Sequence, residues 1–183
     1  FHFPLFTSPH RSKMRIEAMP AVSNNNIQPD VKHMVAAVQE ACDGVKSGEG
    51  GPFGAVIVKD GRVVATGHNM VLANKDPTCH AEVTAIRNAC KALDNMSLAG
   101  CVLYTSCYPC PMCMGASLWA RLDAVYYAAT AEQAAAHGFD DAAFHAFVKD
   151  PKTDDLRVLE HMAVKNVSEP FVMWSSKNDR IQY

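Results

Sequence analysis

The sequence has no long apolar run and no excess of positive charge, and both absences narrow the possible classes of protein. None of its apolar stretches approaches the roughly 20 residues that span a bilayer, and none has the form of a secretory signal. Lysine and arginine number 17 against 19 aspartate and glutamate, for a net charge of −2. Because proteins that bind nucleic acid usually carry a basic face, we expect neither a nucleic acid nor a membrane as partner.

The sequence also lacks the cysteine pattern of a disulfide framework. Its seven cysteines are odd in number and irregularly spaced. Free thiols are typical of a reducing compartment, so we expect a cytoplasmic protein whose cysteines serve metal binding or catalysis. Internal repeats and low-complexity tracts are absent as well, and 49% hydrophobic against 20% charged residues is typical of a globular protein.

A single domain is the expectation for a chain of 183 residues. We assign residues 1–29 to an N-terminal extension without clear periodicity, either native or partly a remnant of cloning. Residues 30–183 form the predicted domain. The extension indicates no function of its own.

Helical and strand periodicities alternate from residue 30 onward. A helix is predicted from the N-cap Asp30 to the glycine-rich "SGEGG", because apolar residues recur at helical spacing at Val31, Met34, Val35, Val38, Cys42 and Val45. The β-rich runs "FGAVIVK" and "RVVATGH" flank Asp60-Gly61 and predict an antiparallel hairpin.

The rest of the chain continues this alternation. Helices are predicted over 79–93, capped by Asp76 or Thr78, then from Pro111 to 122, after a Thr130–Gln133 capping box up to Gly138, and over 169–179. Strands are predicted over 101–106, 124–130 and 156–164. Such alternation is typical of an α/β sandwich with helices on both faces of a mixed sheet.

Two loop-to-helix junctions, "DPTCHAE" and "SCYPCPMC", carry the reactive residues. In α/β sheets, ligands bind where loops lead from strands into helices. Cys110 and Cys113 lie three apart at the opening of a helix, where both thiols can face one side and the helix N-terminus favours thiolates. His80, at the other helix start, is the best candidate for a third ligand, and a His/Cys/Cys set suits Zn²⁺.

Three protein ligands leave the fourth position of tetrahedral zinc open, which is typical of catalytic sites. We therefore expect one zinc ion per subunit with a bound water, whose pKa falls from about 15.7 to about 7. Glu82 follows His80 by two residues, and the two share a site only if the helix is just starting there. Its carboxylate is predicted to move protons between the water and a leaving nitrogen.

Other interpretations of these residues stay open. Cys-x-x-C is equally compatible with a thiol redox pair, and Cys107 or Cys79 could close a purely structural zinc site. Cys42, Cys90 and Cys101 fall on apolar faces and are interpreted as packing residues. The combination of "HAE" with "PCPMC" favours a zinc deaminase, because H-x-E together with P-C-x-x-C is typical of that chemistry.

These motifs resemble the zinc-dependent cytidine deaminase superfamily and, within it, the guanine deaminase branch of bacterial type. The resemblance rests on "GGPFGAVIVKDG", "DPTCHAEVTAIRNAC", "LYTSCYPCPMC" and "GFDD", and extends from about residue 30 to the end. It implies a three-layer αβα sandwich around a five-stranded mixed sheet. It also implies a homodimer whose C-terminal segments are exchanged between subunits.

The resemblance further implies a role for each site residue. His80, Cys110 and Cys113 would hold zinc, Glu82 would shuttle protons, and Asp141 would contact the base and assist proton transfer. The implied base-binding residues are Asn69, Phe53, Trp119, Phe139 and, from the partner chain, Tyr183. Aromatic faces with a few polar groups suit a planar base. Ordinary packing, capping or turn roles are the alternative for each of them.

Two positions depart from the family pattern. Tyr108 stands where an acidic residue is usual, and Cys79 where alanine is common. Neither removes a ligand or Glu82, so we expect hydrolytic deamination of guanine to xanthine and ammonia. Guanosine, cytosine and tRNA adenosine are alternative substrates, and the bulky Trp119 favours the free base over guanosine. A non-enzymatic zinc module is the alternative from another class.

Overall fold

A mixed sheet forms the centre of the computed structural model, which describes residues 28–151 and 159–181. The strands follow the order β2-β1-β3-β4. β1 pairs antiparallel with β2 and with β3, and β3 runs parallel to β4. The strand bounds are Gly54–Lys59 for β1, Arg62–His68 for β2, Cys101–Cys107 for β3 and Ala124–Ala129 for β4.

The sheet has four strands among the described residues, so the prediction of five is wrong for this part of the chain. The missing strand was expected over 156–164. Residues 159–164 contain no strand, and 152–158 lie outside the described residues. Residues 159–181 are all exposed, and none of them pairs with an edge strand of the sheet.

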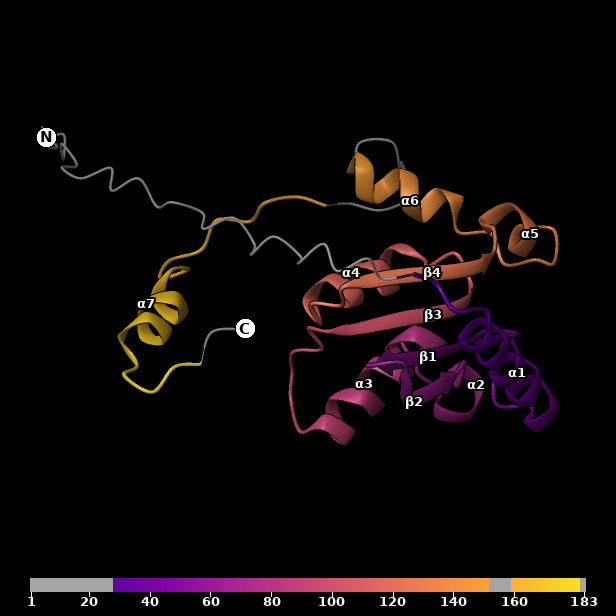
Figure 1. The fold of residues 1–183 in the computed structure, drawn as a ribbon. Helices are drawn as coiled ribbons and strands as arrows, with labels where there is room; N and C mark the ends of the chain where they lie inside the picture. Colours follow the sequence, from indigo (N-terminus) through magenta and orange to yellow (C-terminus); the bar gives the residue numbers. More distant parts are fainter. Residues whose placement is uncertain (1–27, 152–158, 182–183) are drawn as a thin grey trace, which may run out of the picture.

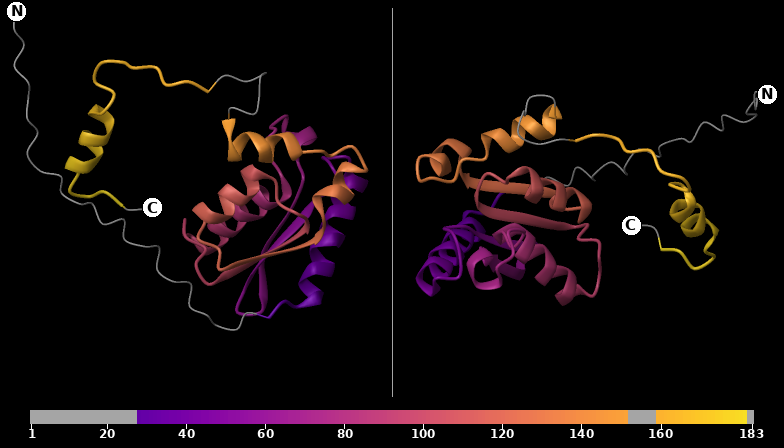
Figure 2. Two further views of the ribbon diagram at one scale, coloured as in Figure 1. Left: turned by 90° about the horizontal axis from the view of Figure 1, so that it is seen from above. Right: turned by 180° about the vertical axis from the view of Figure 1, so that it is seen from behind.

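Helices cover both faces of the sheet, as predicted (Figures 1 and 2). α1 (Val31–Ser47) packs on one face, and α3 (Ala81–Leu93) and α4 (Pro111–Trp119) lie on the other. Side chains of β1 alternate between the two cores: Ala55 and Ile57 belong to the α3 side, whereas Val56 and Val58 belong to the α1 side. Burial of both faces explains why this strand is a continuous apolar run.

The side of α1 that faces the sheet consists mainly of small residues and not of the valines that mark its periodicity. Ala37, Ala41 and Gly44 are buried, together with His33, whose ring centroid lies 5.3 Å from that of Tyr104. A Cβ at Gly54 would collide with the backbone of Ala37 and Ala41, so the helix lies too close to β1 for branched side chains. The valines are left exposed, namely Val31, Val35, Val38 and Val45.

The predicted turns and caps are largely confirmed. Asp60 and Gly61 have φ values of 49° and 71°, the left-handed pair that a two-residue hairpin requires. Asp30 caps α1, and Thr130 forms a capping box at the start of α5 (Ala131–Ala135). The cap of α3 differs from the prediction, because His80 occupies the N-cap position and neither Asp76 nor Thr78 does.

The remaining helices connect or follow this core. α2 (Val71–Asn74) and α6 (Ala142–Lys149) were not predicted, whereas α7 (Glu169–Ser176) lies within the predicted 169–179. Both views of Figure 2 show α7, in yellow, well away from the sheet. None of the described helices is both long and apolar enough to cross a membrane.

Candidate metal centre and active site

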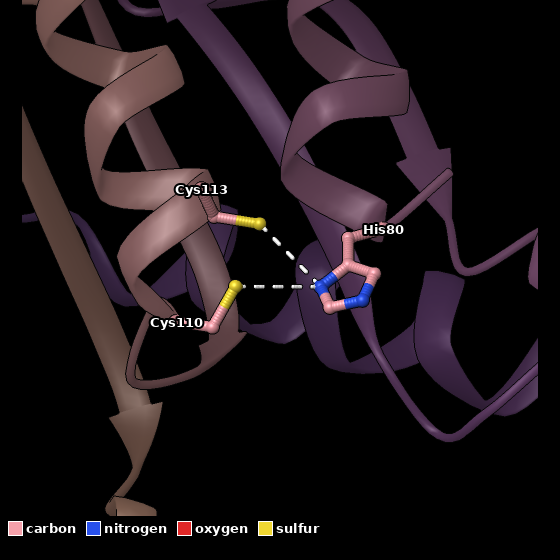
Figure 3. A group of neighbouring side chains, drawn as sticks. All are labelled: His80, Cys110 and Cys113. Atoms are coloured by element: carbon pink, nitrogen blue, oxygen red, sulfur yellow. Dashed lines mark hydrogen bonds between the residues drawn. The ribbon is translucent and has the colours of Figure 1, made fainter. Parts of the chain in front are cut away.

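Two helix starts meet at the centre of the site. His80 is the N-cap residue of α3 and Cys110 that of α4, and both have extended backbones. Neither side chain caps its own helix. Both are therefore free to point into the space between the helices, where Cys113 joins them from the first turn of α4 (Figure 3).

The three side chains are spaced as ligands of one zinc ion. His80 Nδ1 lies 3.6 Å from the Sγ of Cys110 and 3.6 Å from the Sγ of Cys113. With Zn–S near 2.3 Å and Zn–N near 2.0–2.1 Å, ideal tetrahedral angles separate nitrogen from sulfur by about 3.6 Å. Two thiolates and one imidazole also form a donor set that zinc prefers. The residues present therefore fit zinc in both geometry and chemistry.

Cys79 and Cys107, either of which could have closed a structural zinc site, make contacts outside the ligand cluster. The Cys79 thiol donates to Asp76 at 3.1 Å, and the Cys107 thiol faces the carbonyl of Thr130 at 3.8 Å. In the part of the chain that the structure describes, the ligand cluster contains His80, Cys110 and Cys113 alone. All seven cysteines are unbridged, so Cys110 and Cys113 form no disulfide.

The two thiols of the cluster differ in proton affinity. A hydrogen bond from Cys113, aided by His80, lowers the pKa of Cys110 to about 4. The pKa of Cys113 is raised instead, first by its hydrogen bond to Cys110 and then by burial and the nearby Glu82. Metal binding needs both thiols deprotonated, and a divalent cation at the cluster would favour that state.

Glu82 lies directly beside the ligand cluster. Its side chain accepts a hydrogen bond from the Cys113 thiol at 3.3 Å, and the residue is 6% exposed. Burial raises the pKa of its carboxyl group. The structure thus brings His80 and Glu82 to one site, as the start of the helix was expected to allow. A buried carboxylate with raised proton affinity is suited to taking and returning a proton.

A cavity of about 970 Å³ opens in front of this cluster. Besides His80 and Glu82, its lining includes Phe53, Phe139 and Asp141, three of the predicted site residues. The rings of Phe53 and Phe139 meet edge to face, with centroids 4.9 Å apart. This volume is within the usual range for small-molecule sites.

Asn69 also lines the cavity, and its amide has a fixed orientation. Its Oδ1 accepts hydrogen bonds from the backbone N–H groups of Gly51 at 3.1 Å and Val71 at 3.2 Å. Two N–H donors require an oxygen at this position, so the assignment of oxygen and nitrogen is unambiguous. The Nδ2 group is left to offer its two N–H donors to a ligand.

Asp141 is the N-cap residue of α6, although its side chain does not cap the helix. Its Oδ2 lies 3.3 Å from the Nε2 of His145. The two atoms are close but do not have hydrogen-bond geometry. Nε2 of His145 is buried and has no hydrogen-bond partner among the described residues. Asp141 is therefore at the cavity, while its part in proton transfer stays a prediction.

The structure does not bring all the predicted residues to the cavity. Trp119 is 66% exposed at the end of α4, where the Arg121 guanidinium lies 5.7 Å from its ring centroid, and it is not part of the lining. Tyr183 lies outside the described residues. Of the four aromatic residues expected around a base, the described chain thus supplies Phe53 and Phe139.

Tyr108 is a cavity residue whose position the sequence did not reveal. The pattern marked it only as a departure from the usual acid. Its ring packs edge to face on Tyr127, with centroids 5.0 Å apart, and lies 5.8 Å from the ring of His145. Because both partners are distant in sequence, no local pattern could have indicated this packing.

The chain is similar in sequence and in fold to known deaminases. The family model of the cytidine and deoxycytidylate deaminase zinc-binding region matches residues 27–129. The guanine deaminase of Bacillus subtilis (strain 168) is 48% identical over 147 residues, which cover 80% of this chain and 94% of that protein. An X-ray structure of guanine deaminase from Bacillus subtilis has a TM-score of 0.81 at 46% identity, covering 85% of this chain and 99% of that one.

More distant relatives share the central part. A tRNA-specific adenosine deaminase of Aquifex aeolicus (strain VF5) is 43% identical over 93 residues, or 51% of this chain and 61% of that protein. The family match covers more than half of the chain and includes all three ligand residues and Glu82. The chain belongs to the cytidine and deoxycytidylate deaminase zinc-binding family.

Proposed function

We propose that this protein hydrolyses guanine to xanthine and ammonia. One observation carries the proposal: a His/Cys/Cys cluster with zinc spacing lies beside the buried carboxylate of Glu82 at the wall of a cavity large enough for a base. The similarity to a guanine deaminase over most of both chains supports the choice of substrate.

His80, Cys110 and Cys113 would hold one zinc ion per chain, with a water as the fourth ligand. A zinc ion bound there would act as a Lewis acid and lower the pKa of its bound water to about 7. The unbridged state of all seven cysteines is compatible with a reducing cytoplasm, which we propose as the location.

Glu82 is the residue that moves protons. In the proposed reaction, water oxygen attacks C2 of guanine and the bond from C2 to its amino nitrogen breaks. The carboxylate of Glu82 accepts one proton from the water and passes it to ring N3. It then accepts the proton of the new C2 hydroxyl and passes it to the amino group, which departs as ammonia as the C2 carbonyl forms. Asp141, at the same cavity, is proposed to contact the base and assist this transfer.

Asn69 is proposed to select guanine. The edge of guanine that bears O6 and N7 presents two hydrogen-bond acceptors, whereas adenine presents N7 and the donor N6 amino group. The Nδ2 group of Asn69 can donate to both acceptors of guanine, because its Oδ1 is already engaged by Gly51 and Val71. Phe53 and Phe139 are proposed to contact the faces of the base.

Replacing Asn69 with aspartate tests this selection. In Asn69→Asp the oxygen that binds Gly51 and Val71 is retained, but an acceptor replaces the Nδ2 donor. We expect kcat/KM for guanine to fall about 10- to 100-fold, equivalent to about 1.4–2.7 kcal/mol. The reason is that the new aspartate oxygen, an acceptor, would face the acceptors O6 and N7 of guanine. Ammonia release from guanine, guanosine, adenine and cytosine by the zinc-loaded protein measures the effect.

The control for this experiment is Asn88→Asp, since Asn88 bonds the carbonyl of Thr66 away from the cavity. It should keep the wild-type preference for guanine. A wild-type protein that releases no ammonia from guanine but does so from another base would contradict the proposed substrate. An unchanged kcat/KM in Asn69→Asp would contradict the proposed role of Asn69.

We further propose that residues 30–183 form one domain that acts as a homodimer with exchanged C-terminal segments. α7 presents several large apolar side chains to solvent, namely Phe171, Val172, Met173 and Trp174. Burying one such side chain contributes about 1.5–3 kcal/mol, so a second chain that covers them is favoured. Tyr183 is proposed to reach the partner's cavity.

Changing two of these side chains tests the exchange. Phe171→Asp with Trp174→Asp should convert a dimer into a monomer of 19.9 kDa, because the charged groups cannot be buried without partners. Light scattering after size exclusion measures the mass. Tyr183→Ala is the matched control and should stay dimeric while its KM for guanine rises. A wild-type protein that is monomeric at micromolar concentration would contradict the dimer.

A further inference from the structure

His68, at the end of β2, is held between two carboxylates that come from different parts of the chain. Its Nδ1 lies 3.0 Å from Oε1 of Glu40 on α1, and its Nε2 lies 2.7 Å from Oε2 of Glu49 in the loop after α1. The Glu49 carboxylate also accepts a hydrogen bond from the Ser47 hydroxyl at 2.8 Å. The imidazole thus links the helix, the loop and the strand end.

This arrangement requires a protonated imidazole. A neutral histidine has one N–H donor and one acceptor nitrogen, and the acceptor would face a carboxylate oxygen. An imidazolium donates from both nitrogens, and hydrogen bonds between ionised groups are the stronger kind. His68 therefore makes both contacts only in its charged form.

The same loop builds one wall of the cavity. Gly50, Gly51 and Phe53 line it, and the backbone oxygen of Glu49 accepts from the N–H groups of Leu72 and Ala73 at 3.1 and 3.0 Å. Gly51 N–H donates to Asn69 Oδ1, and Asn69 N–H donates to the carbonyl of Phe53 at 2.9 Å. The position of the loop therefore decides the position of the Asn69 amide.

We propose that His68, as an imidazolium bridging Glu40 and Glu49, is a positioning residue that holds residues 48–53 and Asn69 in their base-binding arrangement. The inference rests on the proposed function for the identity of the base. His68 does not touch the base and acts through the loop.

The charges around His68 favour its protonated form. Partial burial lowers the pKa of His68, but its hydrogen bonds to Glu40 and Glu49 raise the pKa more, so that the pKa lies above its ordinary value. The facing groups are Glu40 and Asp43 on α1 and Glu49 in the loop, and Asp43 is itself paired with Lys46. β1 pairs with this end of β2 through Gly54 and brings no charged group there, since its Lys59 lies at the other end of the strand.

The direction of the pH effect follows. Because the pKa of His68 is raised, the imidazolium bridge stabilises the loop fully at a pH below the ordinary histidine pKa near 6.5. This stabilisation is lost as the pH rises through the raised pKa of His68. Base binding should therefore weaken on the alkaline side of pH 6.5.

The test uses His68→Gln in the zinc-loaded full chain, with hypoxanthine as a base that lacks the reacting amino group. We expect the Kd of hypoxanthine to rise about 3- to 10-fold at pH 6.5, because two charge-assisted hydrogen bonds at a partly exposed site are lost. The wild-type Kd should rise with pH, and this rise should flatten in His68→Gln. Glu49→Gln should also weaken binding, and the double variant should be no weaker than the worse single one.

Asp123→Asn is the matched control, since it removes a carboxylate at the opposite end of the sheet, and the asparagine oxygen can still accept from the N–H of Gly100. It should keep the wild-type Kd and pH profile. NMR titration of labelled histidine in the base-free protein reads the charge of His68 without any substrate. A neutral His68 at pH 6.5, or equal Kd values for His68→Gln and Asp123→Asn, would overturn the inference. A failure to deaminate guanine would leave the histidine titration unchanged and would count against the proposed function alone.

Discussion

Glu82→Gln is expected to lower kcat for guanine by about 10²- to 10⁴-fold. Glutamine has the shape of glutamate but cannot accept the proton of the attacking water, and positioned proton transfer contributes about this factor. The zinc content should stay at the wild-type level, because Glu82 is not among the three ligand residues. Steady-state ammonia release together with metal analysis of the purified variant measures both quantities.

Stability separates this chemical effect from misfolding. Burial disfavours the charged form of Glu82 and raises its pKa, so a neutral amide at this position should leave the melting temperature unchanged or higher. Glu132→Gln is the control, since Glu132 is an exposed glutamate in the first turn of α5. A Glu82→Gln variant that turns over guanine at the wild-type rate would exclude Glu82 as the proton carrier.

Cys113→Ser is expected to abolish both zinc binding and activity. The residue is completely buried at the ligand cluster, and a hydroxyl is a poor substitute for a thiolate toward zinc. We expect bound zinc below roughly one tenth of the wild-type level after dialysis, with kcat lower by at least about 10³-fold, since the metal supplies the activated water. Inductively coupled plasma analysis and ammonia release test the two parts separately.

Loss of the metal should also lower stability. A ligand present at about 100 times its Kd stabilises the folded state by about 2.7 kcal/mol, so chelation of wild-type protein should lower its melting temperature. Cys101→Ser makes the same substitution at another completely buried thiol, which packs in the core on the α3 side. It should lower stability while zinc is retained. Full zinc occupancy in Cys113→Ser would show that the ligand set has been misassigned.

The two halves of the candidate metal site could be predicted because each half is local. Cys110 and Cys113 occupy one helical turn, and His80 and Glu82 occupy another, so the geometry of a helix start already brings each pair together. The Asp60-Gly61 hairpin and the Thr130 capping box were predictable for the same reason. Each depends on backbone conformations within four residues.

Features that depend on distant neighbours were predicted poorly. The periodicity of α1 identified the helix but not its buried face, because the close approach of Gly54 admits only alanine and glycine there. Trp119 is exposed at the end of α4 and is not part of the cavity lining of the single chain, so its contact with a base stays a prediction. The predicted fifth strand needs a neighbour that the described residues 159–181 do not have.

The amino-acid sequence by itself determined the alternation of helices and strands and the two local halves of the candidate metal site, His80 with Glu82 and Cys110 with Cys113, because each is written in a few consecutive residues. The two halves, 30 and 33 positions apart, meet only in the folded chain. Only the tertiary structure decided which way the Asn69 amide points and that His68 sits between Glu40 and Glu49. These contacts join residues 18, 19 and 28 positions apart. Hydrogen bonds over such separations form only after α1, its following loop and the end of β2 have packed together, so no local pattern can specify them.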